Sequence, residues 1–521
     1  MAGDDVLERT RGERMTVTAA QHVPDILDCL AQLSNDEVPT PPKLAREMLD
    51  VLPAEVWSEP DYRWLDPFCK SGVFLRESAV RLLEGLAERE PDFETRREHI
   101  YRQMLWGTSI TEMTGHISRR SLYYSRNASS KHSVVRFDTS EGNLSFVRAH
   151  HTFVDGRCVI CGAPEDLERG DARENYAYAF LHGTYPREEI ADMKFDVIVG
   201  NPPYQIDSDG NTRTIPIYHR FVEQALALQP RHVLMITPSR WFSGGLGLDE
   251  YRSRILADTH MKKVVDYPGL FECFPGVEIK GGVSYFLWSR DHRGECEVVT
   301  IRGGVASASM TRALDEFDIF VRSNAAIPIL RKVRAKSEPT LDQRVASRVP
   351  FGLQANFRRY KTSPFPGAVK IHGKRLVGYV EPSEITKNSS WVDEWKALLP
   401  AASDGHGRIP ASVIPRPRIA GPGEACTDTY LVIGHSTDQA EIANLSAYAA
   451  TKFARFLIHI RKVAQHNKPG VFAFVPDLPM DRTWTDEELY KRYGLSANEI
   501  AAIESEIKEM DAPTDAEAVA A

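Results

Sequence analysis

Cysteine is scarce in this chain of 521 residues, and its seven cysteines are an odd number. A disulfide framework is therefore not expected, and the composition favours reduced thiols in a cytoplasmic protein. Apolar runs of about 18 residues are also missing, so no membrane span is predicted. The first residues are acidic and polar, unlike a secretory signal. The net charge of −8 lacks the positive excess that is typical of nucleic-acid binding.

The remaining composition is that of a globular protein, with 42% hydrophobic and 26% charged residues. Apolar strand-like runs alternate with amphipathic helical segments until about residue 320, where the alternation stops. This pattern predicts an α/β fold with a doubly wound, mostly parallel, Rossmann-like sheet, followed by an α+β domain. The predicted parts are a flexible N-terminus at 1–25, the sheet domain at 26–315 with an insertion at 149–185, the second domain at 316–511, and a disordered tail at 512–521.

Asn201-Pro202-Pro203-Tyr204 follows an apolar run, residues 195–200, which is typical of a buried strand. The two prolines stiffen the turn, because each fixes φ and removes an amide donor. Asn201 is therefore expected at the carboxyl end of a strand, where open α/β sheets bind ligands. Its side chain offers one acceptor and two donors, which suits a planar amide or a nucleobase. A rigid turn without any ligand is the alternative.

Three other predicted strands also end near polar groups. They end at Asp66, within residues 105–110, and at Asp138 after the apolar residues 134 and 135. Because the carboxyl ends of parallel strands meet at one edge of a sheet, these groups are expected to lie close together. Further along the chain, residues 283–288 and 297–300 are expected to pair as neighbouring strands.

The insertion contains a cluster of potential metal ligands. Two residues separate Cys158 from Cys161, and a glycine follows the second cysteine. Such a segment forms a knuckle that places both thiolates on one side. His151 and His182 complete four ligands for a structural zinc ion of Cys₂His₂ type, although His150 competes with His151. Free thiols are the alternative, and a redox pair is disfavoured because no thioredoxin-like pattern surrounds the cysteines.

Positive charge is concentrated in the C-terminal third. Residues 331–375 hold twelve Lys and Arg against two acidic residues, and residues 452–468 hold five against none. Interleaved aromatic residues make this the pattern of a surface that follows phosphates, with a solvated helix face as the alternative. The candidate nucleic-acid contacts are Arg358, Arg359, Lys361, Lys374, Arg375, Arg461 and Lys462.

Taken in order, these segments resemble the gamma group of amino-methylating DNA methyltransferases, and most closely the adenine-N6 enzymes of restriction–modification systems. The resemblance covers residues 30–300 motif by motif. It covers the C-terminal third more loosely, where residues 474–476 and 484–490 look like that group's target-recognition region. It implies a methyltransferase domain that uses S-adenosylmethionine, a DNA target-recognition domain, and methyl transfer to N6 of an adenine that is flipped out of duplex DNA.

The resemblance also implies roles for single residues in cofactor binding. Thr40 and Pro41 would pack on the methionine part of S-adenosylmethionine, and Asp66 would lie near its amino group. Asp138 would accept a hydrogen bond from the adenine amine of the cofactor. The complete implied set is Thr40, Pro41, Asp66, Phe68, Cys69, Ser71, Gly72, Ser109, Glu112, Asp138 and Asn201.

The residues implied in catalysis are Asn201, Pro202, Pro203 and Tyr204. The Asn201 side chain and the Pro202 carbonyl would accept hydrogen bonds from the target amine. Tyr204 would stack on the flipped base, and Phe274 would form a second aromatic wall.

Two features depart from the family's pattern. Phe68 and Lys70 stand where Ala and Gly are usual, so a bulky ring and a cation lie beside the expected ligand. Ser109 stands where an acidic residue normally binds the ribose hydroxyls, and Glu112 is the candidate replacement.

Other functions remain open at this point. Cytosine-N4 methylation uses the same chemistry, and methylation of RNA or of a protein glutamine fits less well with the long basic region. A non-catalytic DNA-binding specificity subunit of a defence complex would keep the fold without turnover. No convincing nuclease signature is present, so cleavage is expected to belong to a separate restriction or defence subunit. The expected partner is double-stranded DNA, and no membrane is expected.

Overall fold

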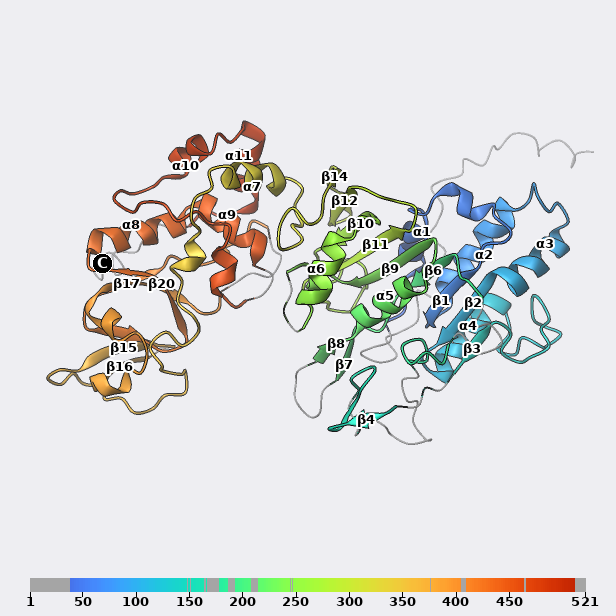
Figure 1. Ribbon diagram of the computed structural model, residues 1–521, viewed down its shortest axis with the longest axis horizontal. Helices are drawn as coiled ribbons and strands as arrows, with labels where there is room; N and C mark the ends of the chain where they lie inside the picture. Colours follow the sequence, from blue (N-terminus) through green and yellow to red (C-terminus); the bar gives the residue numbers. More distant parts are fainter. Residues whose placement is uncertain are drawn as a thin grey trace, which may run out of the picture.

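The computed structural model describes residues 38–147, 149, 151–163, 165, 178–185, 193–207, 214–243, 245, 247–374, 376–403, 409–462 and 465–510. The two predicted flexible ends lie outside these residues. Figure 1 shows two lobes, one containing the large sheet and the other formed by the C-terminal part of the chain in yellow to red. No helix of the described residues is both long and apolar enough to cross a membrane.

The first lobe is built on one large sheet, in which β1 pairs in parallel with both β2 and β6, and β6 pairs in parallel with β9. β11 runs antiparallel between β9 and β10, and β14 adds to β12 at one edge. The strands in spatial order are β13 (Val305–Ala306), β12 (Cys296–Arg302), β10 (Met261–Tyr267), β11 (Val283–Ser289), β9 (His232–Pro238), β6 (Val197–Gly200), β1 (Trp64–Cys69), β2 (Leu105–Ser109) and β3 (Leu144–Phe146), with β14 (Met310–Arg312) outside this order.

Helices cover both faces of this sheet. Side chains along a strand alternate between faces, so Val197 and Val199 belong to one buried apolar cluster and Ile198 belongs to another. The first cluster receives residues from α1 (Pro42–Leu49), α2 (Val73–Gly85) and α4 (Glu112–Tyr123), and the second from α5 (Tyr218–Ala227) and α6 (Asp249–Ala257). This is the doubly wound, mostly parallel sheet that the sequence predicts.

Two strand predictions are wrong. Residues 134–138 form a loop and the strand lies at β3 instead, because Val135 and Phe137 are buried by loop packing rather than by strand pairing. β12 pairs with β10 and not with its sequence neighbour β11. Every residue of β11 is buried, which suits the interior of a sheet, whereas β12 alternates between buried and partly exposed residues, which suits a position near the edge.

The insertion contributes a hairpin of β4 (Phe153–Val154) and β5 (Arg157–Cys158), together with a compact turn at residues 178–185. Both parts join the apolar cluster on the α5 side of the sheet, where Cys158, Cys161 and Phe180 are buried. The Arg220 guanidinium on α5 donates a hydrogen bond to the Ile160 carbonyl. The insertion therefore packs on the helix that follows the Asn-Pro-Pro-Tyr turn.

The C-terminal lobe combines two small sheets with helices, as predicted for an α+β arrangement. One sheet has the order β16-β15-β19 and the other β18-β17-β20. A large apolar cluster runs from Phe317 to Ile507 and a smaller one lies around β15 and β19. The strands are β15 (Val369–Gly373), β16 (Leu376–Val380), β17 (Trp395–Pro400), β18 (Arg418–Ala420), β19 (Glu424–Cys426) and β20 (Tyr430–Ser436), and the helices are α7 (Ala326–Arg334), α8 (Gln439–Ala450), α9 (Lys452–Arg461), α10 (Asp486–Arg492) and α11 (Ala497–Glu506).

Candidate active site

Asp66 and the Asn-Pro-Pro-Tyr turn lie side by side near the carboxyl ends of two central strands of the large sheet. β1 and β6 are parallel neighbours, so Asp66 on β1 and Asn201 after β6 are brought to the same region. They approach so closely that a Cβ atom at Gly200 would lie 2.9 Å from the Asp66 carboxylate oxygen Oδ1. Only glycine fits before Asn201 without displacing that carboxylate or the Phe68 ring.

The Asn201 amide is held in one orientation. Its Nδ2 donates hydrogen bonds to the Val38 carbonyl and to the Thr40 hydroxyl, both at 3.1 Å. Because a carbonyl can only accept, the Val38 contact places the nitrogen of the amide on that side. Asn201 is 3% exposed, and its Oδ1 is buried with no hydrogen-bond partner among the described residues. An oriented acceptor is therefore available for a ligand that donates.

Thr40 contributes to this site and not to the helix that follows it. The N-cap of α1 is Pro41, and no side chain caps the helix. The Thr40 hydroxyl instead accepts from Asn201, which places the predicted Thr40-Pro41 segment against the Asn-Pro-Pro-Tyr turn. Val38 is a residue that sequence reasoning missed, because a backbone carbonyl leaves no signal in the sequence.

Asp66 is a buried carboxyl group. It is 3% exposed, and burial raises its pKa from 3.8 to about 7. Hydrogen bonds from the Phe68 amide and the positive charge of Lys70 favour the ionised form and offset part of this effect. A cationic group of a ligand would favour the ionised form further.

The turn after Asp66, residues 67–72, leads into α2 through a glycine that no other residue can replace without strain. Gly72 caps α2 with a left-handed φ of 73°, and a Cβ atom there would lie 2.9 Å from the Cα of Ser118 on α4. The Ser118 hydroxyl also donates to the Lys70 carbonyl at 3.3 Å. The turn is thus pressed against α4, with the first amides of α2 at the carboxyl edge of the sheet.

Lys70 lies inside the site, as its place in the turn predicts. It is 6% exposed, its Nζ is 3.4 Å from the Val38 carbonyl oxygen, and it lies 5.8 Å from the centre of the Tyr204 ring. The side chain therefore reaches from the turn after Asp66 to the Asn-Pro-Pro-Tyr turn. Lys70 and Asn201 share the same backbone acceptor.

A narrow cavity of about 10 Å³ lies between these groups. It is far smaller than the roughly 300–1,000 Å³ of ordinary small-molecule pockets, and Phe68 and Lys70 form part of its wall. Two buried oxygens at the cavity, Ser71 Oγ and Asn201 Oδ1, have no hydrogen-bond partner among the described residues. The residues that line it are Thr40, Asp66, Phe68, Lys70, Ser71, Gly72, Val73, Phe74 and Asn201.

The thiol of Cys69 packs inside the protein next to Asp66. Cys69 is 1% exposed, its thiol contacts the Asp66 carbonyl oxygen at 3.3 Å, and burial raises its pKa well above the ordinary value. The thiol is therefore a packed, protonated group beside the cavity.

Tyr204 and Phe274 form an aromatic pair next to Asn201. Their ring centres are 6.4 Å apart with an interplanar angle of 74°. Pro202 and Pro203 are buried, and the Tyr204 hydroxyl has no hydrogen-bond partner among the described residues. Phe271, three residues before Phe274, is 53% exposed. The loop after β10 thus brings the predicted second aromatic residue to the Asn-Pro-Pro-Tyr turn.

Ser109 and Glu112, the candidate contacts to the cofactor's ribose, lie apart from Asp138, the candidate contact to its adenine. Ser109 ends β2, is 2% exposed, and has no partner for its hydroxyl among the described residues. Glu112 opens α4 at the same edge with an exposed side chain. Asp138 does not join them. It is exposed in the loop that precedes β3, so it lies before the strand and not at its carboxyl end, and the predicted adenine contact is wrong for this residue.

The four predicted metal ligands come together. One ligand atom from each of His151, Cys158, Cys161 and His182 lies within 4.8 Å of all the others. The Cys161 sulfur is 3.4 Å from His151 Nδ1, and the Cys158 sulfur is 3.8 Å from His182 Nε2. Ligands at zinc distances of about 2.0–2.3 Å in a tetrahedron would be about 3.3–3.8 Å apart, so the donor set fits this ion. The competing His150 lies outside the described residues.

Some basic residues of the C-terminal lobe are exposed to solvent, and others are paired with carboxylates inside the lobe. Arg358, Arg359, Lys361 and Lys374 are exposed, and Arg375 lies outside the described residues. Arg359 pairs with the Glu384 carboxylate at 2.8 Å and Lys361 with that of Glu381 at 4.0 Å, but all four side chains remain open to solvent. The dense positive block of the sequence is largely neutralised by distant carboxylates, as in the pair of Arg344 and Glu441 at 2.7 Å. Sequence counting misses such partners because they lie far along the chain.

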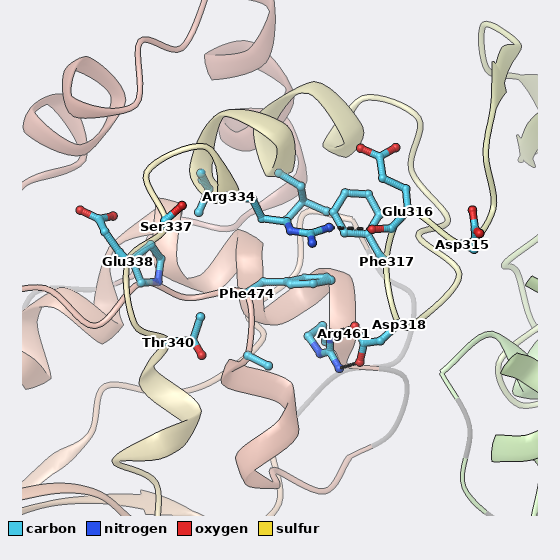
Figure 2. Close-up of a pocket in the computed structure, with 14 residues that line it drawn as sticks. Asp315, Glu316, Phe317, Asp318, Arg334, Ser337, Glu338, Thr340, Arg461 and Phe474 are labelled. Carbon is cyan, nitrogen blue, oxygen red and sulfur yellow. Dashed lines mark hydrogen bonds and ion pairs between the residues drawn. The ribbon is translucent and has the colours of Figure 1, made fainter. Parts of the chain in front are cut away.

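Arg461 and Lys462 do not form the exposed contacts expected of them. Figure 2 shows Arg461 paired with Asp318 beside Phe474 in the wall of a large cavity of this lobe. Both Arg461–Asp318 contacts are 2.6 Å, and the guanidinium carbon is 4.5 Å from the centre of the Phe474 ring. Lys462 is 4% exposed and donates to the Val413 carbonyl at 2.8 Å. Arg461 is thus held in an ion pair and Lys462 is buried, so neither offers the free, exposed cation that was expected of it.

Comparison with known proteins identifies the family. Residues 103–274 match the Eco57I restriction-modification methylase family. A protein of Mycoplasma pneumoniae described as an uncharacterized adenine-specific methylase is 34% identical over 306 residues, which cover 53% of this chain and 72% of the relative.

Solved structures of restriction–modification enzymes are also similar. The type IIL enzyme MmeI in complex with DNA has a TM-score of 0.46 and 10% identity, over 83% of this chain and 64% of that chain. A nuclease-deletion mutant of the type ISP enzyme LlaGI has a TM-score of 0.45 and 8% identity, over 83% of this chain and 44% of that one. This chain thus spans less than two thirds of either enzyme. By its similarity to the Mycoplasma relative and to the Eco57I methylases, the chain belongs to the family of adenine-specific methylases of restriction–modification type.

Proposed function

We propose that this protein transfers a methyl group from S-adenosylmethionine to the N6 amine of an adenine in a specific sequence of duplex DNA. One observation carries the proposal. The Asn201 amide is fixed by Val38 and Thr40 so that a buried acceptor oxygen without a partner lies beside the Asp66 carboxyl group. That oxygen suits an amine donor, which is the group that an adenine presents.

The chain's own residues would activate the amine by orientation. An aromatic amine is a poor nucleophile because its lone pair is delocalised into the ring. Hydrogen bonds to Asn201 Oδ1 and to the Pro202 carbonyl would draw the nitrogen towards tetrahedral geometry and localise that pair. No strong base is then needed, because the amine can lose its proton to water after it has gained the methyl group, when that proton is acidic. Positioning supplies much of the rate. The adenine must leave the stack to reach this buried acceptor, and Tyr204 and Phe274 are the aromatic residues that would hold it.

S-adenosylmethionine supplies an electrophilic methyl group when bound. The cavity would have to widen to admit it, with Asp66 for its cationic amino group and the turn from Phe68 to Gly72 for its methionine part. Ser109 and Glu112, which do not line the cavity, would hold its ribose. The buried oxygens without a partner and the close backbone approach at Gly72 support this assignment.

We further propose that the insertion binds a structural zinc ion through His151, Cys158, Cys161 and His182. Their clustering and donor types support zinc rather than a harder cation. Two metal-binding thiolates also suit reducing surroundings such as the cytoplasm.

The C-terminal lobe would recognise the DNA target. Arg358, Arg359, Lys361 and Lys374 are the exposed cations in this proposal, and each would contribute a salt-dependent phosphate contact. Cleavage of unmodified DNA would belong to a separate restriction or defence subunit.

Expression of the protein in a host that lacks adenine methylation tests the proposal. Single-molecule sequencing should find N6-methyladenine in one sequence context, and the variant Asn201→Ala should leave that context unmodified. Methylation of cytosine N4 alone would overturn the adenine assignment. A biological activity that persists in the Asn201 variant would favour a non-catalytic specificity subunit.

A further inference from the structure

Phe68 is a wall of the methyl-donor cavity whose position must be maintained by its neighbours. It is 1% exposed and lines the cavity beside Asp66. Its ring lies so close to the strand before Asn201 that a Cβ atom at Gly200 would be 2.5 Å from the Phe68 Cε2 atom. Any shift of this ring would change both the cavity and the backbone that carries Asn201.

Two aromatic rings hold Phe68 by edge contacts. Phe221 on α5 lies 5.4 Å away at 81°, and Phe180 from the insertion lies 6.3 Å away at 85°, both measured between ring centres. Tyr178 from the insertion packs in turn against Phe221, at 5.5 Å and 80°. All four rings are at most 1% exposed. The insertion therefore contacts Phe68 directly through Phe180 and supports its other neighbour through Tyr178.

Phe180 and a predicted zinc ligand belong to the same closed turn. The His182 amide donates to the Tyr178 carbonyl at 3.0 Å, and the Thr184 amide donates to the Ala179 carbonyl at 3.0 Å. His182 faces the Cys158 sulfur at 3.8 Å. Because Phe180 stands two residues before His182 inside this turn, fixing the imidazole also fixes the ring.

We propose that the Cys₂His₂ cluster maintains the methyl-donor pocket through Phe180, a positioning residue that holds the Phe68 ring in place. The inference rests on the proposed function, since the pocket matters only if it binds S-adenosylmethionine. It accounts for the bulky Phe68 where the family usually has alanine, because a large wall needs an external support and the insertion provides one. Loss of the metal would then weaken binding of the methyl donor although no ligand of the metal lines the cavity.

A purely structural insertion would affect stability and not affinity, so the test measures both. Phe180→Leu removes the ring while keeping an apolar side chain and every metal ligand. Phe320→Leu is the matched control, because Phe320 is also 1% exposed and belongs to the same apolar cluster but stacks on Phe242, 4.1 Å away. Zinc content by mass spectrometry, thermal unfolding, and S-adenosylmethionine affinity by calorimetry are measured on each full-length protein.

We expect Phe180→Leu to retain one zinc per chain and to bind S-adenosylmethionine about five- to tenfold more weakly, in line with the loss of one aromatic pair. Phe320→Leu should melt at a similarly lowered temperature and bind as tightly as wild type. Removing zinc from the wild type with a chelator should weaken binding by about the same factor. Removing it from Phe180→Leu should add little, because the two changes act through one contact.

Wild-type affinity in a folded Phe180→Leu protein would overturn the inference, as would equal weakening in the Phe320 control. If Phe180→Leu does not fold, Phe68→Leu removes the same contact from the other side, and undiminished affinity in that variant would overturn it equally. A wild-type protein that holds no zinc refutes the metal assignment and with it the coupling. A wild-type protein that binds zinc but no S-adenosylmethionine refutes the proposed function itself.

Discussion

Replacing Asp66 by asparagine should stabilise the ligand-free protein at high pH and leave its stability nearly unchanged at low pH. The carboxyl group lies inside the first lobe at 3% exposure, and burial raises its pKa from 3.8 to about 7. Asparagine keeps the shape and the acceptor for the Phe68 amide, which is 3.2 Å from Oδ1. It removes only the ability to carry a buried negative charge.

The sign and size follow from linkage between proton binding and folding. Between about pH 4 and pH 7 the folded protein holds a proton on Asp66 that the unfolded chain has lost, so raising the pH favours unfolding. The cost grows by about 1.4 kcal/mol for each pH unit and reaches about 4 kcal/mol above pH 7. The variant escapes this cost. Its free energy of unfolding should exceed that of the wild type by an amount that grows from near zero at about pH 4 to about 4 kcal/mol at about pH 8.

Urea unfolding of both proteins at several pH values, with a spectroscopic probe in the first lobe, measures this difference. Asp61→Asn supplies the baseline, because it removes an exposed carboxylate from the same segment. A difference between Asp66→Asn and wild type that stays constant from pH 5 to pH 8 would refute the reasoning. The same variant should lose S-adenosylmethionine binding, because a neutral amide cannot pair with the amino group of the cofactor.

Four other perturbations have defined outcomes. Gly72→Ala should lower the free energy of unfolding by about 1–3 kcal/mol and impair cofactor binding, since alanine is strained at a φ of 73° and its Cβ would press on α4; calorimetry and thermal melts check this. Cys161→Ser should lose bound zinc, measured by elemental analysis, and full zinc content in that variant would refute the metal assignment. Arg461→Ala should destabilise the C-terminal lobe by about 1–2 kcal/mol through its lost ion pair and ring contact. Arg358→Ala should leave stability unchanged but weaken DNA binding and reduce its salt dependence, and the reverse pattern in this pair would contradict their assignment.

The proximity of Asp66 and Asn201 could be predicted from the sequence, because it depends only on two neighbouring parallel strands. Asn201 follows β6 as predicted, whereas Asp66 lies inside β1, which continues to Cys69 and does not end at Asp66. Because β1 and β6 are parallel neighbours, the two residues still come close together, as the sequence predicts. The metal cluster was predictable for a similar reason, because two cysteines two residues apart form a knuckle by local geometry alone. Both predictions used short-range patterns and one general rule of sheet topology.

Other features depended on contacts that no local pattern reveals. Asp138 ends a short apolar stretch that resembles a strand, but Val135 and Phe137 are buried by a loop and the true strand begins six residues after Asp138. Arg344 belongs to the positive block of the sequence, but Glu441, 97 residues further along the chain, lies beside it and neutralises its charge. The Val38 carbonyl, which orients Asn201, is invisible in the sequence because every residue has one.

The central claim is that Asn201 directs methyl transfer to adenine N6. Its most direct test incubates the purified protein and its Asn201→Ala variant with unmethylated DNA and S-adenosylmethionine that carries a deuterated methyl group, followed by mass spectrometry of the nucleosides. We predict deuterated N6-methyladenine with the wild type and none with the variant, although both melt at the same temperature and bind DNA equally. Deuterated N4-methylcytosine without N6-methyladenine, or equal methylation by the two proteins, would contradict the account.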